Sequence, residues 1–126
     1  MLEEKAMPTV VIVEPYKDFA AALQEVVALA HCKPVTIGNV AGLSELSKPP
    51  AAIVVRVATN LPFESPHAGL DDMHPDKRPL VVALTSSDAD VAEANRLGCE
   101  VVLREPQQVR GLYDALTHVV KTFGRT

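Results

Sequence analysis

Residues 9–15 read TVVIVEP, and this short stretch decides the class of fold. Consecutive β-branched residues without a polar interruption are typical of a strand that is buried on both faces, as in a parallel sheet. Glu14 and Pro15 end the run. Pro15 is expected at the first position of the following helix, where its missing N–H costs nothing. The stretch therefore predicts a buried strand that leads directly into a helix.

The same alternation of apolar runs and helical segments continues along the chain. Further strands are expected at 35–40, 51–57, 80–84 and 101–103. Helices are expected at 16–30, 41–46, 88–97 and 109–123, from apolar residues at helical spacing. Ser87 is expected to cap the helix at 88–97 and Gly98 to end it. Pro34 is expected to stop the first helix, whose apolar stripe begins at Phe19.

This order of elements predicts an α/β protein with a parallel five-stranded sheet covered by helices on both faces. The 126 residues fit one domain, since domains usually hold ~100–200 residues. We assign the domain to 9–126 and an N-terminal extension to 1–8. The stretch 58–79 contains four prolines, so the third helix is expected to be short or irregular.

Composition excludes several classes of function. The net charge of −4 gives no basic surface for direct nucleic-acid binding. No apolar run is long enough for a membrane span or a signal peptide, so we expect a cytoplasmic protein without membrane contact. The two cysteines, Cys32 and Cys99, are expected to be reduced and to act as small buried apolar residues.

Two clusters of reactive side chains have ordinary explanations. His31 and Cys32 are neighbours in sequence and lack a third orienting group, so a helix-end histidine beside a buried cysteine is favoured over a nucleophile and its base. The irregular stretch holds histidines and acids without the spacing of a metal site, and a solvated acidic segment is favoured there. These residues are His67, Asp71, Asp72, His74 and Asp76.

In an open parallel sheet, ligands bind at the carboxyl ends of the strands, so the residues that follow each strand are the candidate site. Those residues are Glu14, Pro15, Arg56, Thr85, Ser86, Arg104, Glu105 and Pro106. No glycine-rich phosphate loop or nucleophile elbow accompanies them, which makes an enzyme the least favoured hypothesis. We expect no catalytic residue, no metal and no cofactor.

The segments VIVEPY, PAAIVVRV, ALTSS and GCEVVLREP together resemble the receiver domain of bacterial two-component response regulators. The resemblance covers nearly the whole chain. It implies a flavodoxin-like (βα)₅ fold with the strand order 2-1-3-4-5. In that family the first strand ends in two acids, the third in the phosphorylated Asp, the fourth in Thr or Ser, and the fifth in Lys-Pro.

The chemical positions of the family are largely replaced in this chain. Arg56 stands where the phosphorylated Asp is expected, and a guanidinium cannot accept a phosphoryl group. Glu105 replaces the family lysine, and Pro15 replaces one metal-binding acid. Glu14, Thr85 and Pro106 remain in type. The resemblance therefore implies a degenerate, or pseudo-, receiver that is not phosphorylated at this site and does not bind Mg²⁺ there.

The exchanged charges predict an internal ion pair. A buried Arg56 needs an anionic partner, and we expect Glu105, Glu14 or both to provide it. The alternative is an Arg56 that points to solvent without a role. For Thr85, a contribution to the start of the following helix is favoured over a switching hydroxyl.

Two functional hypotheses follow from the resemblance. The first is a phosphorylation-independent signalling module that binds another protein, or a second copy of itself, through the fourth helix, fifth strand and fifth helix. On that face, the candidate contacts are Val91, Asn95, Arg104, Arg110, Tyr113 and Asp114. The alternative is a small-anion sensor in which Arg56 and Thr85 hold a carboxylate or phosphate at the strand ends.

Overall fold

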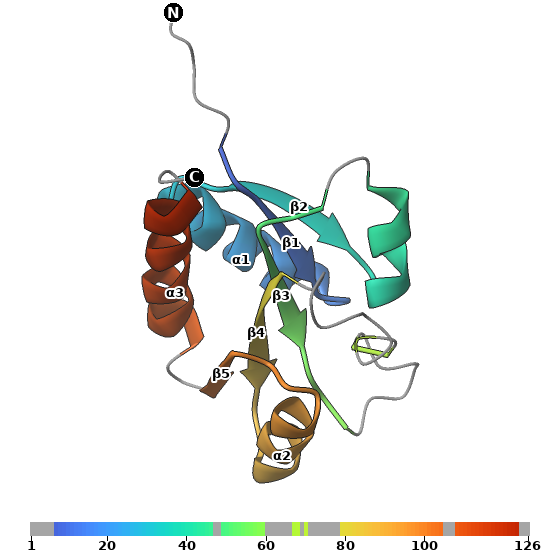
Figure 1. The fold of residues 1–126 in the computed structure, drawn as a ribbon. Helices are drawn as coiled ribbons and strands as arrows, with labels where there is room; N and C mark the ends of the chain where they lie inside the picture. The colour runs from blue at the N-terminus through green and yellow to red at the C-terminus, as the bar shows by residue number, and fades with distance from the viewer. Residues whose placement is uncertain are drawn as a thin grey trace, which may run out of the picture.

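A five-stranded parallel sheet forms the centre of the protein in the computed structural model, which describes residues 7–46, 49–59, 67–68, 70, 79–104 and 108–123 (Figure 1). The strands are β1 Thr9–Val13, β2 Lys33–Ile37, β3 Ala52–Arg56, β4 Leu80–Thr85 and β5 Val101–Arg104. The helices are α1 Lys17–Leu29, the 3₁₀ helix η1 Val40–Glu45, α2 Asp88–Arg96 and α3 Gln108–Phe123. The strand order is β2-β1-β3-β4-β5, with all pairs parallel, which confirms the predicted topology.

Successive side chains of the central strands pack alternately into two separate hydrophobic cores, one on each face of the sheet. Val10 and Ile12 of β1 face the first core, whereas Val11 and Val13 face the second. The same alternation holds in β3 and β4. This division explains the uninterrupted apolar runs, because side chains of successive residues point to opposite faces and both faces are covered.

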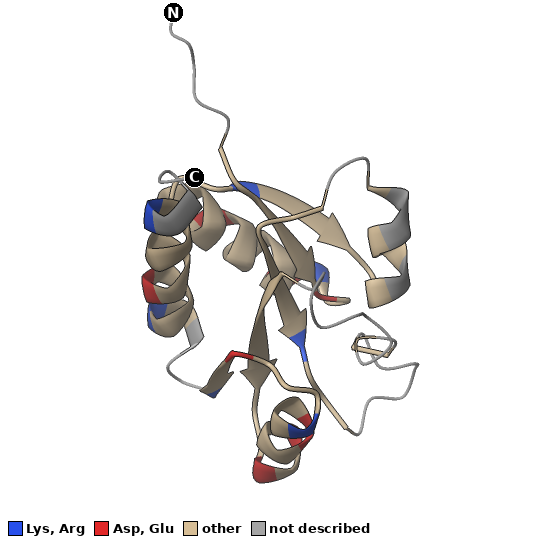
Figure 2. Cartoon of the chain, viewed as in Figure 1, with Lys and Arg blue, Asp and Glu red and all other residues tan. Residues whose placement is uncertain are grey.

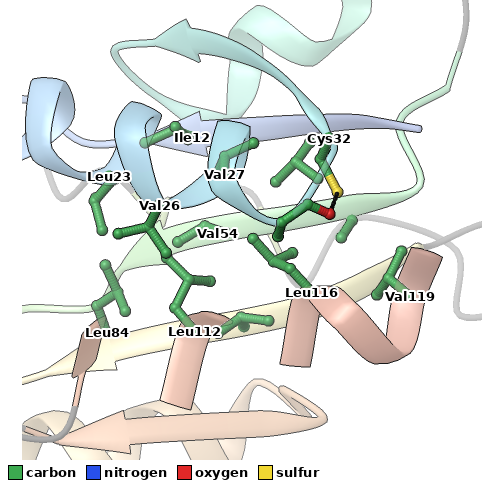
Figure 3. Packing of buried hydrophobic residues seen from close by; sticks show 14 residues of the cluster. Ile12, Leu23, Val26, Val27, Cys32, Val54, Leu84, Leu112, Leu116 and Val119 are labelled. Carbon is green, nitrogen blue, oxygen red and sulfur yellow. Dashed lines mark hydrogen bonds between the residues drawn. The ribbon is translucent and has the colours of Figure 1, made fainter. Parts of the chain in front are cut away.

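The first core lies between the sheet and the helix pair α1 and α3 (Figure 3). Leu23 and Val27 of α1 meet Leu112 and Leu116 of α3 in one cluster. Cys32 is completely buried there, and burial raises the pKa of its thiol. Cys32 therefore behaves as the predicted small apolar residue, while the neighbouring His31 is exposed just after α1.

The second core lies on the opposite face, under η1 and α2. Val40 of η1 and Ala94 of α2 pack there with Leu70 from the connection between β3 and β4. The remainder of the predicted short helix in that connection, and the acids and His74 beside it, lie outside the described residues. Among the described helices, none has the length and apolar character needed to cross a membrane.

Helix α2 begins and ends as its sequence predicts. The Ser87 side chain accepts a hydrogen bond from the backbone N–H of Asp90, at 3.2 Å, and so caps the first turn. Gly98 adopts φ 76° directly after the helix, a conformation that glycine adopts without strain.

Three predictions about helix α1 and its flanking prolines are wrong. Helix α1 begins at Lys17, with Tyr16 as its N-cap, so Pro15 precedes the helix instead of opening it. The helix ends at Leu29, and Pro34 lies inside β2, which is tolerated because β2 is an edge strand. Phe19 is 51% exposed and does not belong to the core stripe of α1.

Candidate functional site

Arg56 and Glu14 form a buried ion pair at the carboxyl edge of the sheet. The Arg56 Nε donates to Oε1 of Glu14 at 2.7 Å. The two side chains are 9% and 0% exposed. The register explains the contact, because Val13 pairs with Val55 and each charged residue directly follows one of these two. The predicted pairing of Arg56 with Glu14 is confirmed, and the solvent-facing alternative is wrong.

Glu105, the other predicted partner of Arg56, lies outside the described residues. Glu14 itself is fully engaged without it. Its second oxygen, Oε2, accepts a hydrogen bond from the backbone N–H of Tyr16 at 3.2 Å. Both oxygens of this buried carboxylate thus have partners, as a charge removed from water requires.

Two aromatic residues at the start of α1, Tyr16 and Phe19, lie beside the ion pair. The Arg56 guanidinium carbon is 5.1 Å from the centroid of the Phe19 ring, a cation–π distance. Phe19 and Tyr16 are in turn edge-to-face, with centroids 6.3 Å apart. This contact gives the half-exposed Phe19 a role at the site, a role that its place in a helical stripe did not reveal.

Thr85 does not start the following helix, contrary to our expectation. Its side chain is completely buried, and Oγ1 donates to the backbone carbonyl of Leu103 at 2.9 Å. The hydroxyl therefore joins the end of β4 to the end of β5. Ser87 caps the helix instead, because it stands at the N-cap and Thr85 is still in the strand.

The described side chains at this edge do not fit a Mg²⁺ site. Mg²⁺ requires several oxygen ligands, usually carboxylates and waters. Glu14 offers the one carboxylate at the ends of β1 and β3, and it is already bound to a cation and a backbone N–H. Within the described ranges, no group of three metal-ligating side chains occurs. The chemistry of this edge is that of a neutralised internal ion pair.

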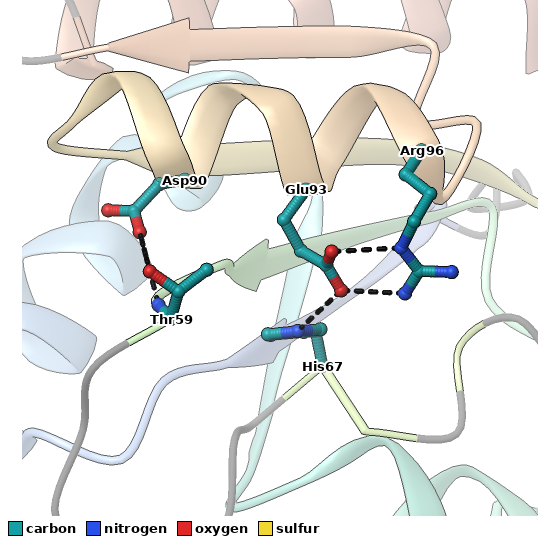
Figure 4. A network of polar contacts seen from close by, with 5 residues as sticks. All are labelled: Thr59, His67, Asp90, Glu93 and Arg96. Carbon is teal, nitrogen blue, oxygen red and sulfur yellow. Dashed lines mark hydrogen bonds and ion pairs between the residues drawn. The ribbon is translucent and has the colours of Figure 1, made fainter.

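A second polar centre, which the sequence analysis missed, lies between α2 and the residues after β3 (Figure 4). Asp90 is buried, and its Oδ1 accepts from the backbone N–H and the hydroxyl of Thr59, at 3.1 and 3.2 Å. Its Oδ2 accepts from the Ser86 N–H at 3.2 Å. The sequence does place Asp90 three residues after the N-cap Ser87, as in a capping motif, which indicates a structural role for its carboxylate. No local pattern, however, predicts Thr59 as its hydrogen-bond partner.

One turn along α2, Glu93 contacts two side chains, Arg96 and His67. Its carboxylate binds Arg96 through two contacts, at 2.9 and 2.7 Å. Its Oε2 lies 3.4 Å from Nε2 of His67, which belongs to the connection between β3 and β4. The Arg96 guanidinium, with a smaller contribution from His67, lowers the pKa of Glu93. His67 is buried, so the prediction of a solvated residue is wrong at this position.

The predicted interaction face lies on α2, β5 and α3. Asn95, Arg104, Arg110, Tyr113 and Asp114 are exposed, and Val91 is half-buried. Arg104, at the end of β5, forms an ion pair with Asp88 in the first turn of α2. Gly111 brings α3 close to β5, since a Cβ at this position would lie 2.6 Å from Cδ2 of Leu103.

Charges of both signs are distributed along α2 and α3 (Figure 2). In the part of the chain that the structure describes, lysine and arginine occur once or twice on each of α1, β2, β3, α2, β5 and α3. They do not form the concentrated basic stripe that a nucleic-acid backbone requires.

Comparisons with solved structures identify the fold. A response regulator receiver domain from Clostridium thermocellum superposes with a TM-score of 0.73 and 12% identity, covering 94% of this chain and 98% of its own. The receiver domain of a signal transduction histidine kinase from Syntrophus aciditrophicus gives 0.75 and 20%, covering 94% of both chains. The phosphorylated cyanobacterial phytochrome response regulator RcpA gives 0.68 and 20%, with coverages of 90% and 91%. No protein-family model and no curated protein sequence matches the chain.

Proposed function

Since the chain has the fold of response regulator receiver domains, we propose that it is a signalling module that works without phosphorylation. The proposal depends on one observation, the buried ion pair between Arg56 and Glu14. Arg56 occupies the end of the third strand, where the family carries its phosphorylated Asp. A neutralised cation at the end of the third strand supports a module that does not use this position as a nucleophile.

Phosphoryl transfer to this edge is chemically unfavourable. An arginine stays protonated and has no free electron pair with which to attack phosphorus. Glu14 is a carboxylate, but both of its oxygens have partners and its side chain has no exposed surface. A phosphoryl donor would have to break the ion pair first, which leaves two buried charges without partners.

The anion-sensor hypothesis requires an Arg56 that faces an open cleft. Instead, Glu14 binds the Arg56 Nε, and the Arg56 side chain is 9% exposed. An incoming carboxylate or phosphate would have to compete with a partner that is already desolvated and correctly oriented. We therefore favour a fixed site over a ligand-binding one.

Amide chemical-shift titration of the ¹⁵N-labelled protein tests the proposal. We expect no saturable shifts at Glu14, Arg56 or Thr85 on addition of Mg²⁺ with beryllofluoride, and no mass gain after incubation with acetyl phosphate. A receiver domain that retains the third-strand Asp is the positive control. Saturable shifts with beryllofluoride would contradict the proposal, and shifts with phosphate or carboxylates alone would favour the sensor.

We further propose that the module binds its protein partner, or a second copy of itself, through the α2-β5-α3 face. Tyr113 is exposed on α3 and supplies the large amphipathic side chain typical of interface centres. Sedimentation across a concentration series tests the homodimer. We expect Tyr113→Ala to weaken self-association and Leu29→Ala, at a more exposed apolar site on α1, to leave it unchanged. A concentration-independent monomer would exclude the homodimer and leave a different protein as the partner.

A further inference from the structure

Strand β5 is an edge strand that pairs with another strand on one side only. The sheet ends at β5, which pairs with β4 and lies between α2 and α3 (Figure 1). In the part of the chain that the structure describes, no strand lies along its outer side. Residues 101–103 are half-buried and Arg104 is exposed. Because an edge strand presents backbone N–H and C=O groups without partners, a second extended segment can pair with it.

The hydrogen bonds at the end of β5 show which backbone groups face outwards. The carbonyl of Leu103 accepts a hydrogen bond from the Thr85 hydroxyl of β4, at 2.9 Å, and so faces that strand. In a strand, the backbone groups of successive residues point to alternate sides. The N–H and C=O groups of Val102 and Arg104 therefore face away from β4, towards the outside of the sheet.

The opposite edge of the sheet, formed by β2, is protected against such pairing. The Lys33 N–H donates to the carbonyl of Pro8 beside β1, so the next residue, Pro34, faces outwards. Proline has no N–H to offer, and an outward proline blocks the addition of a further strand. Strand β5 reads VVLR and contains no proline. The unprotected edge is thus the one that lies within the α2-β5-α3 face.

We propose that two copies of this chain pair through antiparallel β5 strands, which join the two sheets across a twofold axis at Val102. The inference rests on the proposed function, because it names the contact that the α2-β5-α3 face makes in a homodimer. In this register, the outward N–H and C=O groups of Val102 bind those of the same residue in the second copy. Since both copies use the same surface, the assembly closes at a dimer.

The charges at the two ends of β5 favour this register. Glu100 directly precedes β5 and Arg104 ends it, and both are exposed. With the axis at Val102, each of these residues lies opposite the other one in the second copy. Opposite charges that face each other across two antiparallel strands attract. A register centred on Arg104 would instead oppose two guanidinium groups.

The present contacts of these two residues are compatible with the pairing. Arg104 forms an ion pair with Asp88, but the two side chains are 49% and 94% exposed, and exposed ion pairs contribute little. A guanidinium has five N–H donors, so it can also bind a second carboxylate. Glu100 accepts the Val81 N–H through Oε1, at 2.8 Å, and its Oε2 can accept from an incoming guanidinium.

Sedimentation together with amide hydrogen exchange of the full chain at low and high concentration tests the inference. In the dimeric sample, the amides of Val102 and Arg104 should exchange at least tenfold more slowly, because they become paired. The amides of Val101 and Leu103, which face β4 in both samples, should change little. A dimer without added protection at Val102 and Arg104 would overturn the strand pairing alone. A concentration-independent monomer would overturn both the pairing and the proposed homodimer.

Val102→Pro is the direct test of the backbone contact. It removes the outward N–H and no hydrogen bond to β4, as Pro34 does in β2. We expect a folded monomer at concentrations at which the unmodified protein is a dimer. Val102→Thr is the matched control, since it keeps the N–H and the branched shape, and it should dimerise. A folded Val102→Pro protein that dimerises as tightly as Val102→Thr would overturn the inference.

Exchanged charges provide a second test that does not depend on the folding of Val102→Pro. Arg104→Glu and Glu100→Arg should each weaken self-association at least tenfold, because like charges then face each other at both ends of the paired strands. An equimolar mixture of the two variants should associate again, since every facing pair in the mixed dimer has opposite charges. A mixture that associates no better than the separate variants would contradict the register at Val102.

Discussion

Arg56, the last residue of β3, and Glu14, the first residue after β1, are joined at 2.7 Å although 42 positions separate them in the chain. Both are buried, and the cation is further covered by the ring of Phe19 at 5.1 Å. A buried ion pair thereby occupies this edge of the sheet.

Glu14→Gln should destabilise the protein by about 3 kcal/mol, because it leaves the buried Arg56 charge without its anion. Chemical unfolding in urea measures the effect. The exposed Glu25→Gln is the control and should change stability by less than about 0.5 kcal/mol.

The double variant Glu14→Leu with Arg56→Met should recover most of that loss, since a buried ion pair can be replaced by apolar residues of similar size at little cost. If the double variant is no more stable than Glu14→Gln, the ion pair stabilises the fold by more than the neutralisation of its two charges.

Asp90→Asn should cost about 1.5–3 kcal/mol, because a buried carboxylate that accepts three hydrogen bonds is replaced by a group with one acceptor oxygen. The amide nitrogen would face a donor at Thr59 or Ser86. Asp88→Asn, on the exposed first turn of the same helix, should cost about 1 kcal/mol at most. Equal effects of the two substitutions would contradict the structural role given to Asp90.

Ser87→Ala should destabilise the protein by about 1 kcal/mol through loss of the cap on α2. Ser87→Asp should retain most of the stability, because its carboxylate can accept the same N–H and interacts favourably with the helix dipole. Thermal unfolding distinguishes the two. Ser86→Ala serves as the neighbouring control, since the Ser86 side chain is exposed and its backbone N–H is retained.

Replacing glycine by alanine inside a helix normally raises the free energy of unfolding by roughly 1 kcal/mol. Gly111→Ala should not show this increase, because the added methyl group would lie 2.6 Å from Cδ2 of Leu103. In the background of Leu103→Ala, the same substitution should become stabilising. A double-mutant cycle in urea measures this coupling. Additive effects of the two substitutions would show that α3 can move away from β5 without cost.

The low pKa of Glu93 predicts how its contribution to stability varies with pH. Its folded-state pKa lies below the ordinary value of 4.5, so the unfolded chain binds the proton more readily. Its contribution is therefore complete above pH 4.5 and is lost as the pH falls through the lower folded-state value. In urea unfolding, the stability difference between the unmodified protein and Glu93→Gln should thus shrink as the pH falls below 4.5. A difference that stays constant or grows on acidification would contradict this sign.

Much of the fold could be predicted because its signals are local. The apolar run of β1 was placed at its observed bounds, and Ser87 and Gly98 marked the ends of α2 correctly. Prolines were less reliable guides. Pro15 stands before a helix and Pro34 inside an edge strand, since a missing N–H is equally acceptable in either place.

The sequence by itself determined the layered α/β architecture and the presence of a cation at the end of the third strand. It also restricted the partner of Arg56 to two acids, because a buried cation needs an anion. Only the tertiary structure decided that Glu14 binds its Nε, that Thr85 bonds to the carbonyl of Leu103, and that His67 faces Glu93. The physical reason is that strand register and the packing of α2 bring these atoms together across the sheet, and neither is encoded in the spacing of residues along the chain.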